Sequence, residues 1–140
     1  MEELWCIICI SSVAKDLNIQ EAEQMLKAAR ISRKERDITG LAVYADRNNL
    51  ILIEGEKSAV RNDFDAARQH AGHYNIIKIY DKSLSTLFFQ DYPLAVRSVS
   101  RDLKMFDDFT EPEQKKFFDE FLALNNSVSQ VIREFIRNNS

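Results

Sequence analysis

The sequence predicts an α+β fold with the element order β-α-β-β-α-β, an added strand and a C-terminal pair of helices. Three features predict it. Two apolar runs, at 38–45 and 50–53, enclose the polar cluster 46–49, which is typical of a β-hairpin. The segments on both sides of this hairpin carry apolar residues at helical spacing. The C-terminal segment repeats that spacing twice, with no strand pattern between the two repeats.

The predicted hairpin is expected at the centre of a sheet. Its strands, Ile38 to Ala45 and Leu50 to Ile53, are nearly continuous apolar runs, so both of their faces should be buried. Gly40 lies inside the first strand, where a glycine suggests close backbone approach or a bulge. Gly55 follows the second strand and suggests a sharp turn into a helix.

Two elements are predicted before the hairpin. The first is a strand from Leu4 to Ile10, apolar on both faces and ended by the serines that follow it. The second is a helix that begins at a capping box of Asn18 and Glu21 and reaches about Ile31. Its apolar residues are Ala22, Met25, Leu26 and Ala29.

After the hairpin, Ser58 can cap a second helix that ends near Gly72, with Val60, Phe64 and Ala67 on its inner face. A fourth strand covers 75–80 and a fifth covers about 94–99. The order is the ferredoxin-like arrangement. Because each crossover of this kind is right-handed, both helices should lie on one face of the sheet.

The opposite face of the sheet needs a cover, and the C-terminal residues can supply one. A capping box at 110–113 begins a helix, and a second helix follows the Asn125-Asn126 pair. Together they predict an αα-hairpin that packs on the sheet or on a partner. The apolar stripe consists of Phe117, Phe118, Phe121, Leu122, Leu124, Val128, Val131, Ile132, Phe135 and Ile136. We expect part of this stripe to cover the sheet and part to meet another chain.

Length and composition limit the classes of function that the chain can have. A chain of 140 residues with 45% hydrophobic residues is long enough for a domain at 1–100 with a helical appendage at 101–140. With a net charge of −3 and its bases interleaved with acids, it is not expected to bind nucleic acid. The N-terminal apolar run stops at Ile10, so no membrane span is expected and a cytoplasmic location is predicted.

No catalytic or metal-binding constellation is found, so we expect neither an enzyme nor a metal site. Cys6 and Cys9 form a Cys-x-x-Cys pair, but three residues apart on a strand they should face opposite sides, as buried packing residues. His70 and His73 are expected in exposed or helix-terminal positions. An RNA-binding sheet would need aromatic residues on its central strands, where the third strand has Leu50 to Ile53.

Two motifs of the hairpin are similar to those of a known family. Ile38-Thr39-Gly40-Leu41 with Tyr44, then Ile53-Glu54-Gly55-Glu56 with Val60, resemble the BLUF family of blue-light sensors using flavin. The resemblance covers roughly residues 4–99 in the same order of elements. Phe89 to Leu94 resembles the family's Phe-x-x-Trp-Ser-Met element, with Tyr92 for tryptophan and Leu94 for methionine.

The resemblance implies a flavin held between the two helices, against the sheet. It also implies that the photoactive residues are replaced. The family's tyrosine lies two residues before a serine, so with Ser11 as that serine its position is Cys9. The glutamine position is Ile51. The asparagine position is Arg33, with Ser32 beside it.

Two functions therefore remain open. The first is a flavin-free regulatory protein of the BLUF fold that acts through protein contacts or self-association of its C-terminal helices. The alternative is a photoreceptor that binds FAD or FMN with non-standard photochemistry, using Cys9 with Tyr44 or Tyr92 as donor. If no flavin is bound, Ile51 should be buried against Met25, Leu26 or Ala29, because an empty cleft would cost many kcal/mol at roughly 24 cal/mol per Å³.

Overall fold

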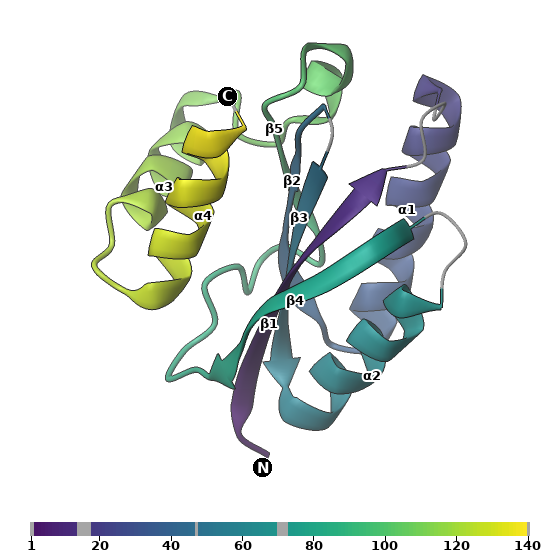
Figure 1. Ribbon diagram of the computed structural model, residues 1–140. Coiled ribbons are helices and arrows are strands. Elements are labelled where there is room, and N and C mark those ends of the chain that lie inside the picture. Colours follow the sequence, from purple (N-terminus) through teal and green to yellow (C-terminus); the bar gives the residue numbers. More distant parts are fainter. Residues whose placement is uncertain (1, 14–17, 47, 70–72, 140) are drawn as a thin grey trace.

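The computed structural model describes residues 2–13, 18–46, 48–69 and 73–139. Within these residues, five strands form one mixed sheet with helices on both of its faces (Figure 1). The spatial order of the strands is β4-β1-β3-β2-β5. This arrangement confirms the predicted α+β, ferredoxin-like fold, and the added strand pairs with β2.

The strands are β1 (Leu4–Val13), β2 (Thr39–Tyr44), β3 (Asn48–Glu56), β4 (His73–Ser83) and β5 (Ala95–Ser98). β3 lies between β1 and β2 and is antiparallel to both, whereas β5 is parallel to β2. The β2-β3 hairpin is therefore internal to the sheet, as its apolar runs predict.

Several predicted strand limits are wrong. β3 covers 48–56 instead of 50–53, so Gly55 lies inside this strand and not after it, and β4 continues to Ser83. β1 does not end at Ser11 and Ser12, because these residues pair with Asn49 and Asn48 of β3. β4 begins at His73, two residues earlier than predicted. His70 lies outside the described residues.

One helical layer consists of α1 (Ile19–Glu35) and α2 (Lys57–Arg68), which lie on the same face of the sheet (Figure 1). Asn18 caps α1 as predicted: its side chain accepts from Glu21 N. The predicted cap of α2 is wrong, because α2 begins at Lys57. Ser58 N and Ser58 Oγ donate instead to the Glu2 carboxylate.

The second helical layer is the predicted C-terminal hairpin, α3 (Pro112–Leu122) and α4 (Ser127–Asn138), which covers the opposite face (Figure 1). A short 3-10 helix, η1 (Arg101–Phe106), connects β5 to this layer and was not predicted. Among the described residues, no helix is both long and apolar enough to cross a bilayer.

Strand alternation divides the core into two sides. Cys9, Ile7 and Ile53 point to the α1/α2 side, and Ile51 packs against the same cluster, as predicted. Cys6 and Ile8 point to the α3/α4 side. Both cysteines are buried and free, on opposite faces of β1, which confirms their prediction as packing residues.

The phenylalanines of the C-terminal hairpin are covered within the chain. Phe118, Phe121 and Phe135 are buried, and Phe117 is half-buried. Phe118 stacks on Phe109, with ring centroids 4.5 Å apart. These rings therefore form core between the sheet and the helices.

Gly40 is required by the close approach of β2 to β3. Its φ is +156°, and a Cβ at this position would lie 2.0 Å from Leu52 O. The same Cβ would lie 3.1 Å from a guanidinium nitrogen of Arg33. The glycine that the sequence marks as a close backbone approach therefore borders Arg33, the residue that the resemblance assigns to the family's asparagine position.

Candidate functional site

The candidate site is the region between α1, α2 and the strands β1 and β3, where the resemblance implies a flavin, and we call this region the cleft. Cys9 is 1% exposed and packs in an apolar cluster under α2. The other buried members are Ile7, Ile38, Ile53, Val60 and Phe64. Ile51 packs against this cluster but is only half-buried, so the expectation that it is fully buried is wrong. The Leu26 side chain belongs to a different cluster, near β5.

Arg33 reaches from the last turns of α1 into this cleft and is 6% exposed. Its Nη1 lies 3.2 Å from Pro93 O and 3.5 Å from Leu52 O, both of which accept hydrogen bonds from it. The guanidinium therefore binds carbonyls of β3 and of the segment before β5. Burial lowers the pKa of Arg33, and Asp63 opposes that shift.

Asp63 faces Arg33 from α2. Its Oδ2 lies 3.9 Å from Arg33 Nη2, and its Oδ1 lies 3.1 Å from Arg36 Nη1. The Asp63 side chain is 11% exposed, so this is a largely buried ion pair between the two helices. Removing one partner of such a pair costs about 3–5 kcal/mol, because the other charge is left buried and uncompensated.

The remaining predicted site residues divide between the two sides of the sheet. Ser11 is buried on β1 and lies on the same face as Cys9. Ser32 is half-buried on α1, where its Oγ accepts from Arg36. Leu94 packs beside α1 with Leu26 and Ala42. Tyr92 packs on the opposite side, stacked on Phe117 with ring centroids 5.7 Å apart. The structure thus brings Cys9, Arg33, Ser11 and Leu94 to one side and places Tyr92 on the other.

Two of the three residues named for the alternative chemistry, Cys9 and Tyr44, are poorly suited to proton release at neutral pH. Burial raises the pKa of Cys9 to about 11, with a further rise from Asp63 and an opposing effect of Arg33. Burial also raises the pKa of Tyr44, which is half-buried near the same arginine. The thiol and the phenol are therefore both protonated at neutral pH.

A comparison with family profiles matches residues 4–95 to "BLUF: Sensors of blue-light using FAD". The chain belongs to the BLUF family. The match spans β1 to the start of β5 and includes both helices that border the cleft. A comparison with curated proteins finds no match.

Solved BLUF structures share the fold of this chain. BlrB in its dark state is 23% identical with a TM-score of 0.66, and the match covers 86% of this chain and 95% of BlrB. BlsA in its photo-activated state is 21% identical with a TM-score of 0.67, covering 89% of this chain and 98% of BlsA.

A longer protein, BlrP1 of Klebsiella pneumoniae in a manganese/cyclic diGMP complex, also matches. It is 16% identical with a TM-score of 0.75, and the match covers 96% of this chain but 33% of BlrP1. This chain thus spans about a third of that protein. At these identities the likeness shows the fold alone.

The residues of the BLUF cleft do not fit FAD in this conformation. A guanidinium is a donor only, so Arg33 cannot accept a hydrogen bond from a flavin ring. Its donors are already directed at Pro93 O, Leu52 O and Asp63. Ile51, in the glutamine position, neither donates nor accepts. The polar groups of Arg33 are therefore paired within the chain.

Sequence reasoning missed Asp63, although its spacing carries a signal. Val60, Asp63, Phe64 and Ala67 follow the i, i+3, i+4, i+7 pattern of one helix face, so a carboxylate on that face requires a buried partner. Arg33 lies seven residues after Leu26, a spacing that places both residues on the inner face of α1. Two opposite charges on facing helix stripes predict an interhelical ion pair.

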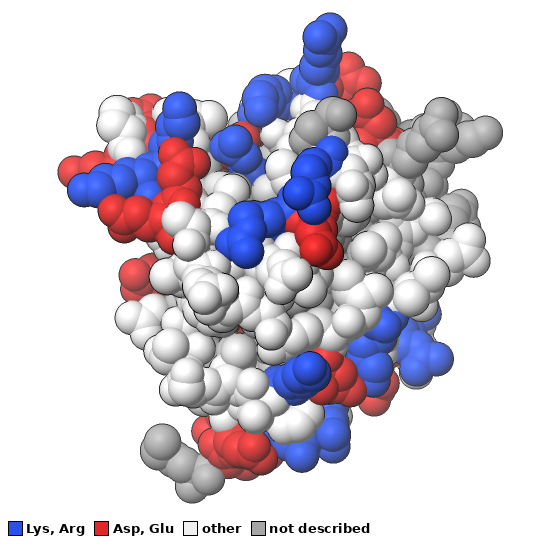
Figure 2. All heavy atoms as spheres, turned by 60° about the vertical axis from the view of Figure 1, so that its left-hand side comes forward, with Lys and Arg blue, Asp and Glu red and all other residues white. Residues whose placement is uncertain are grey.

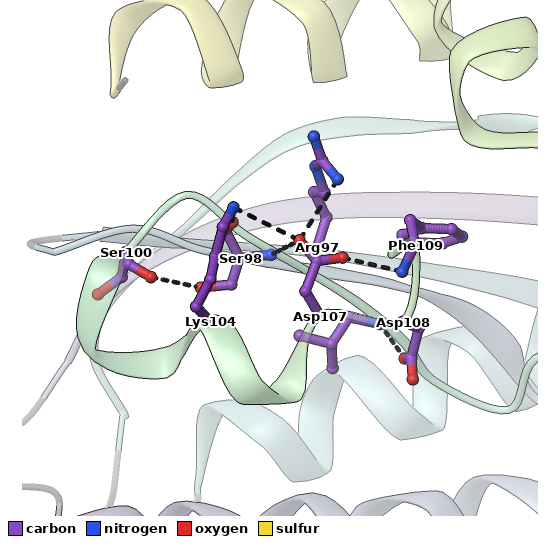
Figure 3. Close-up of polar contacts among 8 residues, drawn as sticks. Arg97, Ser98, Ser100, Lys104, Asp107, Asp108 and Phe109 are labelled. Carbon is purple, nitrogen blue, oxygen red and sulfur yellow. Dashed lines mark hydrogen bonds and ion pairs between the residues drawn. The ribbon is translucent and has the colours of Figure 1, made fainter. Parts of the chain in front are cut away.

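Sequence reasoning also missed a polar network at the β5 edge (Figure 3). Asp108 Oδ2 accepts from Val96 N at 2.7 Å and from Arg30 Nη2 of α1 at 2.7 Å. The neighbouring Asp107 Oδ2 pairs with Arg97 Nη1 at 3.3 Å, and Asp107 Oδ1 accepts from Phe109 N. Figure 3 shows the two carboxylates turned in opposite directions. Asp108 therefore connects β5 to α1, whereas the contacts of Asp107 stay within the 97–109 segment.

Two hollows of the described surface lie elsewhere. One is lined by the outer face of α3, including Lys115 and Glu120. The other lies between the 86–92 segment and Phe117. Neither is lined by a residue of α1 or α2. Within the described part of the chain, no group of three potential His, Cys, Asp or Glu ligands could hold a metal ion.

Proposed function

We propose that this BLUF-family protein is a flavin-free regulatory module that acts through protein contacts. The single observation that carries the proposal is the buried guanidinium of Arg33, which lies in the family's asparagine position and is bound by the chain's own acceptors. A flavin would have to displace these contacts without offering an equivalent carboxylate. The apolar side chains of Cys9 and Ile51 beside it favour packing over ring recognition.

The experiment is expression of the chain with abundant FAD, followed by an absorbance scan of the purified protein. We expect a colourless protein. A variant with the family's residues restored, Cys9→Tyr/Arg33→Asn/Ile51→Gln, serves as the matched comparison and is expected to retain more flavin than the wild type. A stoichiometric flavin band in the wild type that shifts to the red on illumination would contradict the proposal.

One observation favours the alternative of an FAD-binding photoreceptor. Asn49 Oδ1 is buried and has no hydrogen-bond partner among the described residues. Asn49 pairs with Ser11 on one side and Tyr44 on the other, so the three share the cleft face of the sheet. An unpaired acceptor of this kind could take a hydrogen bond from a flavin N–H. The variant Asn49→Leu should lower flavin retention only if this alternative holds.

We also propose self-association through the side of the molecule that carries α3 and α4. Figure 2 shows this side, where charged residues border a broad uncharged area. The turn between α3 and α4 exposes Leu124 by 43%. The edge strand β4 exposes Ile77 by 61% and Ile79 by 42%. Apolar surface that is exposed in this way marks contacts between proteins when it is contiguous.

Light scattering of the purified chain tests the association. We expect an oligomer that Leu124→Glu weakens, because the new charge would be buried in the contact. Ile77→Glu is the comparison. If Ile77→Glu weakens the oligomer more than Leu124→Glu does, the contact lies at β4. Both side chains are exposed, so neither change should unfold the chain. A monomer at all concentrations in the wild type would refute self-association.

A further inference from the structure

Three charged side chains join the two helices that border the cleft. Arg33, near the end of α1, and Arg36, the residue that follows α1, approach the two carboxylate oxygens of Asp63 in the middle of α2. The distances are 3.9 Å for Arg33 and 3.1 Å for Arg36. We call this set of three residues the clasp.

We infer that the clasp holds α1 and α2 together over the cleft, in the role that a bound flavin would otherwise have, and that the cleft opens when the clasp is broken. The inference rests on the proposed function, because a flavin and the Arg33 guanidinium would require the same space. It goes further because it gives a function to Asp63 and Arg36, two residues for which the resemblance implies no role.

The position of Asp63 supports the inference. It lies on the inner face of α2 between Val60 and Phe64, which are buried in the core. A carboxylate in such a position is tolerated only when it is paired, because desolvation of an unpaired charge is costly. Arg33 is likewise enclosed, so loss of Asp63 leaves a buried cation facing an apolar cluster. Water then has to enter between the helices to solvate that cation.

Cys9 lies beneath the clasp and can report its opening. Cys9 is 1% exposed on the cleft side of β1, and it packs in one cluster with Val60 and Phe64, the buried residues on either side of Asp63. Cys6 is 0% exposed and points to the α3/α4 side. A reagent that enters through the cleft should therefore reach Cys9 and leave Cys6 protected.

The experiment measures thiol labelling by methyl methanethiosulfonate without any flavin present. Cys9 is followed in a Cys6→Ala chain, and Cys6 is followed in a Cys9→Ala chain. Each of these two single-cysteine chains also carries either Asp63→Asn or Arg33→Met. These two changes break the clasp from opposite sides, and they act oppositely on the thiol: loss of Asp63 favours the thiolate, whereas loss of Arg33 disfavours it.

We expect both changes to speed the labelling of Cys9 by about tenfold or more, because each shifts a local opening equilibrium, while labelling of Cys6 stays slow. Asp65→Asn, which removes an exposed carboxylate from the same helix, should leave the Cys9 rate unchanged. If Asp63→Asn or Arg33→Met fails to fold, Arg36→Met breaks the exposed arm of the clasp and should give a smaller increase.

Labelling rates of Cys9 that move in opposite directions in the two variants would overturn the inference, since they would report thiol ionisation alone. Equal increases at Cys6 and Cys9 would also overturn it, since they would report global unfolding. The wild-type absorbance scan is independent of this result. A flavin band in the wild type contradicts the proposed function, whereas unchanged Cys9 labelling in every variant contradicts the clasp.

Discussion

At the scale of single residues, the cleft is defined by what replaces the family's polar contacts. Arg33 is longer than asparagine and carries five N–H donors but no acceptor. Its guanidinium donates hydrogen bonds to Pro93 O and Leu52 O, so its donors are paired within the chain. Cys9 is smaller than tyrosine and lies in the apolar floor. Both side chains are thus bound or packed within the chain.

The thiol of Cys9 should be unreactive in the native protein at neutral pH. Burial raises its pKa to about 11, so the thiolate is scarce below that pH and its labelling should accelerate only as pH approaches this value. Burial also raises the pKa of Cys6 far above its usual range. Reaction with Ellman's reagent, with and without urea, provides the measurement. Fast reaction of either thiol in the native protein would show that the burial of β1 is incomplete.

At the scale of elements, a buried carboxylate binds the irregular segment between β4 and β5. Glu54 is 0% exposed at the end of β3. Its oxygens accept from Phe88 N at 2.9 Å, from Phe89 N at 2.6 Å and from Thr39 Oγ1 at 3.0 Å. The Glu of the family's Glu-Gly motif therefore attaches this segment to the centre of the sheet, where Phe89 enters the α3/α4 core.

Glu54→Gln should destabilise the protein by about 1–3 kcal/mol, because an amide N–H₂ would face a buried backbone donor. Burial is the largest influence on Glu54 and raises its pKa above 4.5. A group with a raised folded-state pKa contributes stability that is fully present below the unfolded pKa and is lost as pH rises through the folded pKa.

The stability deficit of Glu54→Gln relative to the wild type should therefore be largest in acid and shrink as pH rises from about 4.5, since only the wild type titrates. Urea denaturation at a series of pH values measures this deficit. Glu56→Gln is a suitable control, because Glu56 is exposed two residues along the chain. A deficit that is constant across the series would show that Glu54 keeps an ordinary pKa in the folded state.

At the scale of the whole molecule, the sheet is covered on both sides by the same chain. The cluster under α3 and α4 contains Leu52 and Ile8 from the central strands together with Phe118 and Ile132 from the helices. The C-terminal hairpin is therefore part of the core. Removing residues 101–140 would expose that face of the sheet, so the truncated chain is expected to aggregate.

Ile132→Ala should cost about 2–5 kcal/mol of unfolding free energy, because Ile132 is 0% exposed and leaves a cavity between α4 and the sheet. Leu124→Ala removes a side chain that is 43% exposed on the same hairpin and should cost less than about 0.5 kcal/mol. Urea denaturation of both variants gives the comparison. Equal costs would mean that α4 is not packed on the sheet as described.

The sequence by itself determined the order of the elements, the central hairpin and the division of Cys6 and Cys9 between two faces. These follow from local patterns: apolar alternation with period two, helical spacing, capping residues and glycines at close approaches. The resemblance assigns Cys9, Arg33 and Ile51 to the positions of the family's photoactive residues by their distance along the chain from its motifs, and this assignment stays a prediction.

Only the tertiary structure decided what those replacements do. Asp63 is thirty residues from Arg33 along the chain, and Pro93 is sixty residues from it, so no local pattern joins them. Likewise, the phenylalanine stripe could have met a second chain until the fold showed Phe118 and Phe121 packed between α3 and the sheet. Side chains that are distant in sequence meet only when the helices close on the sheet, and that packing makes Arg33 a bound internal cation.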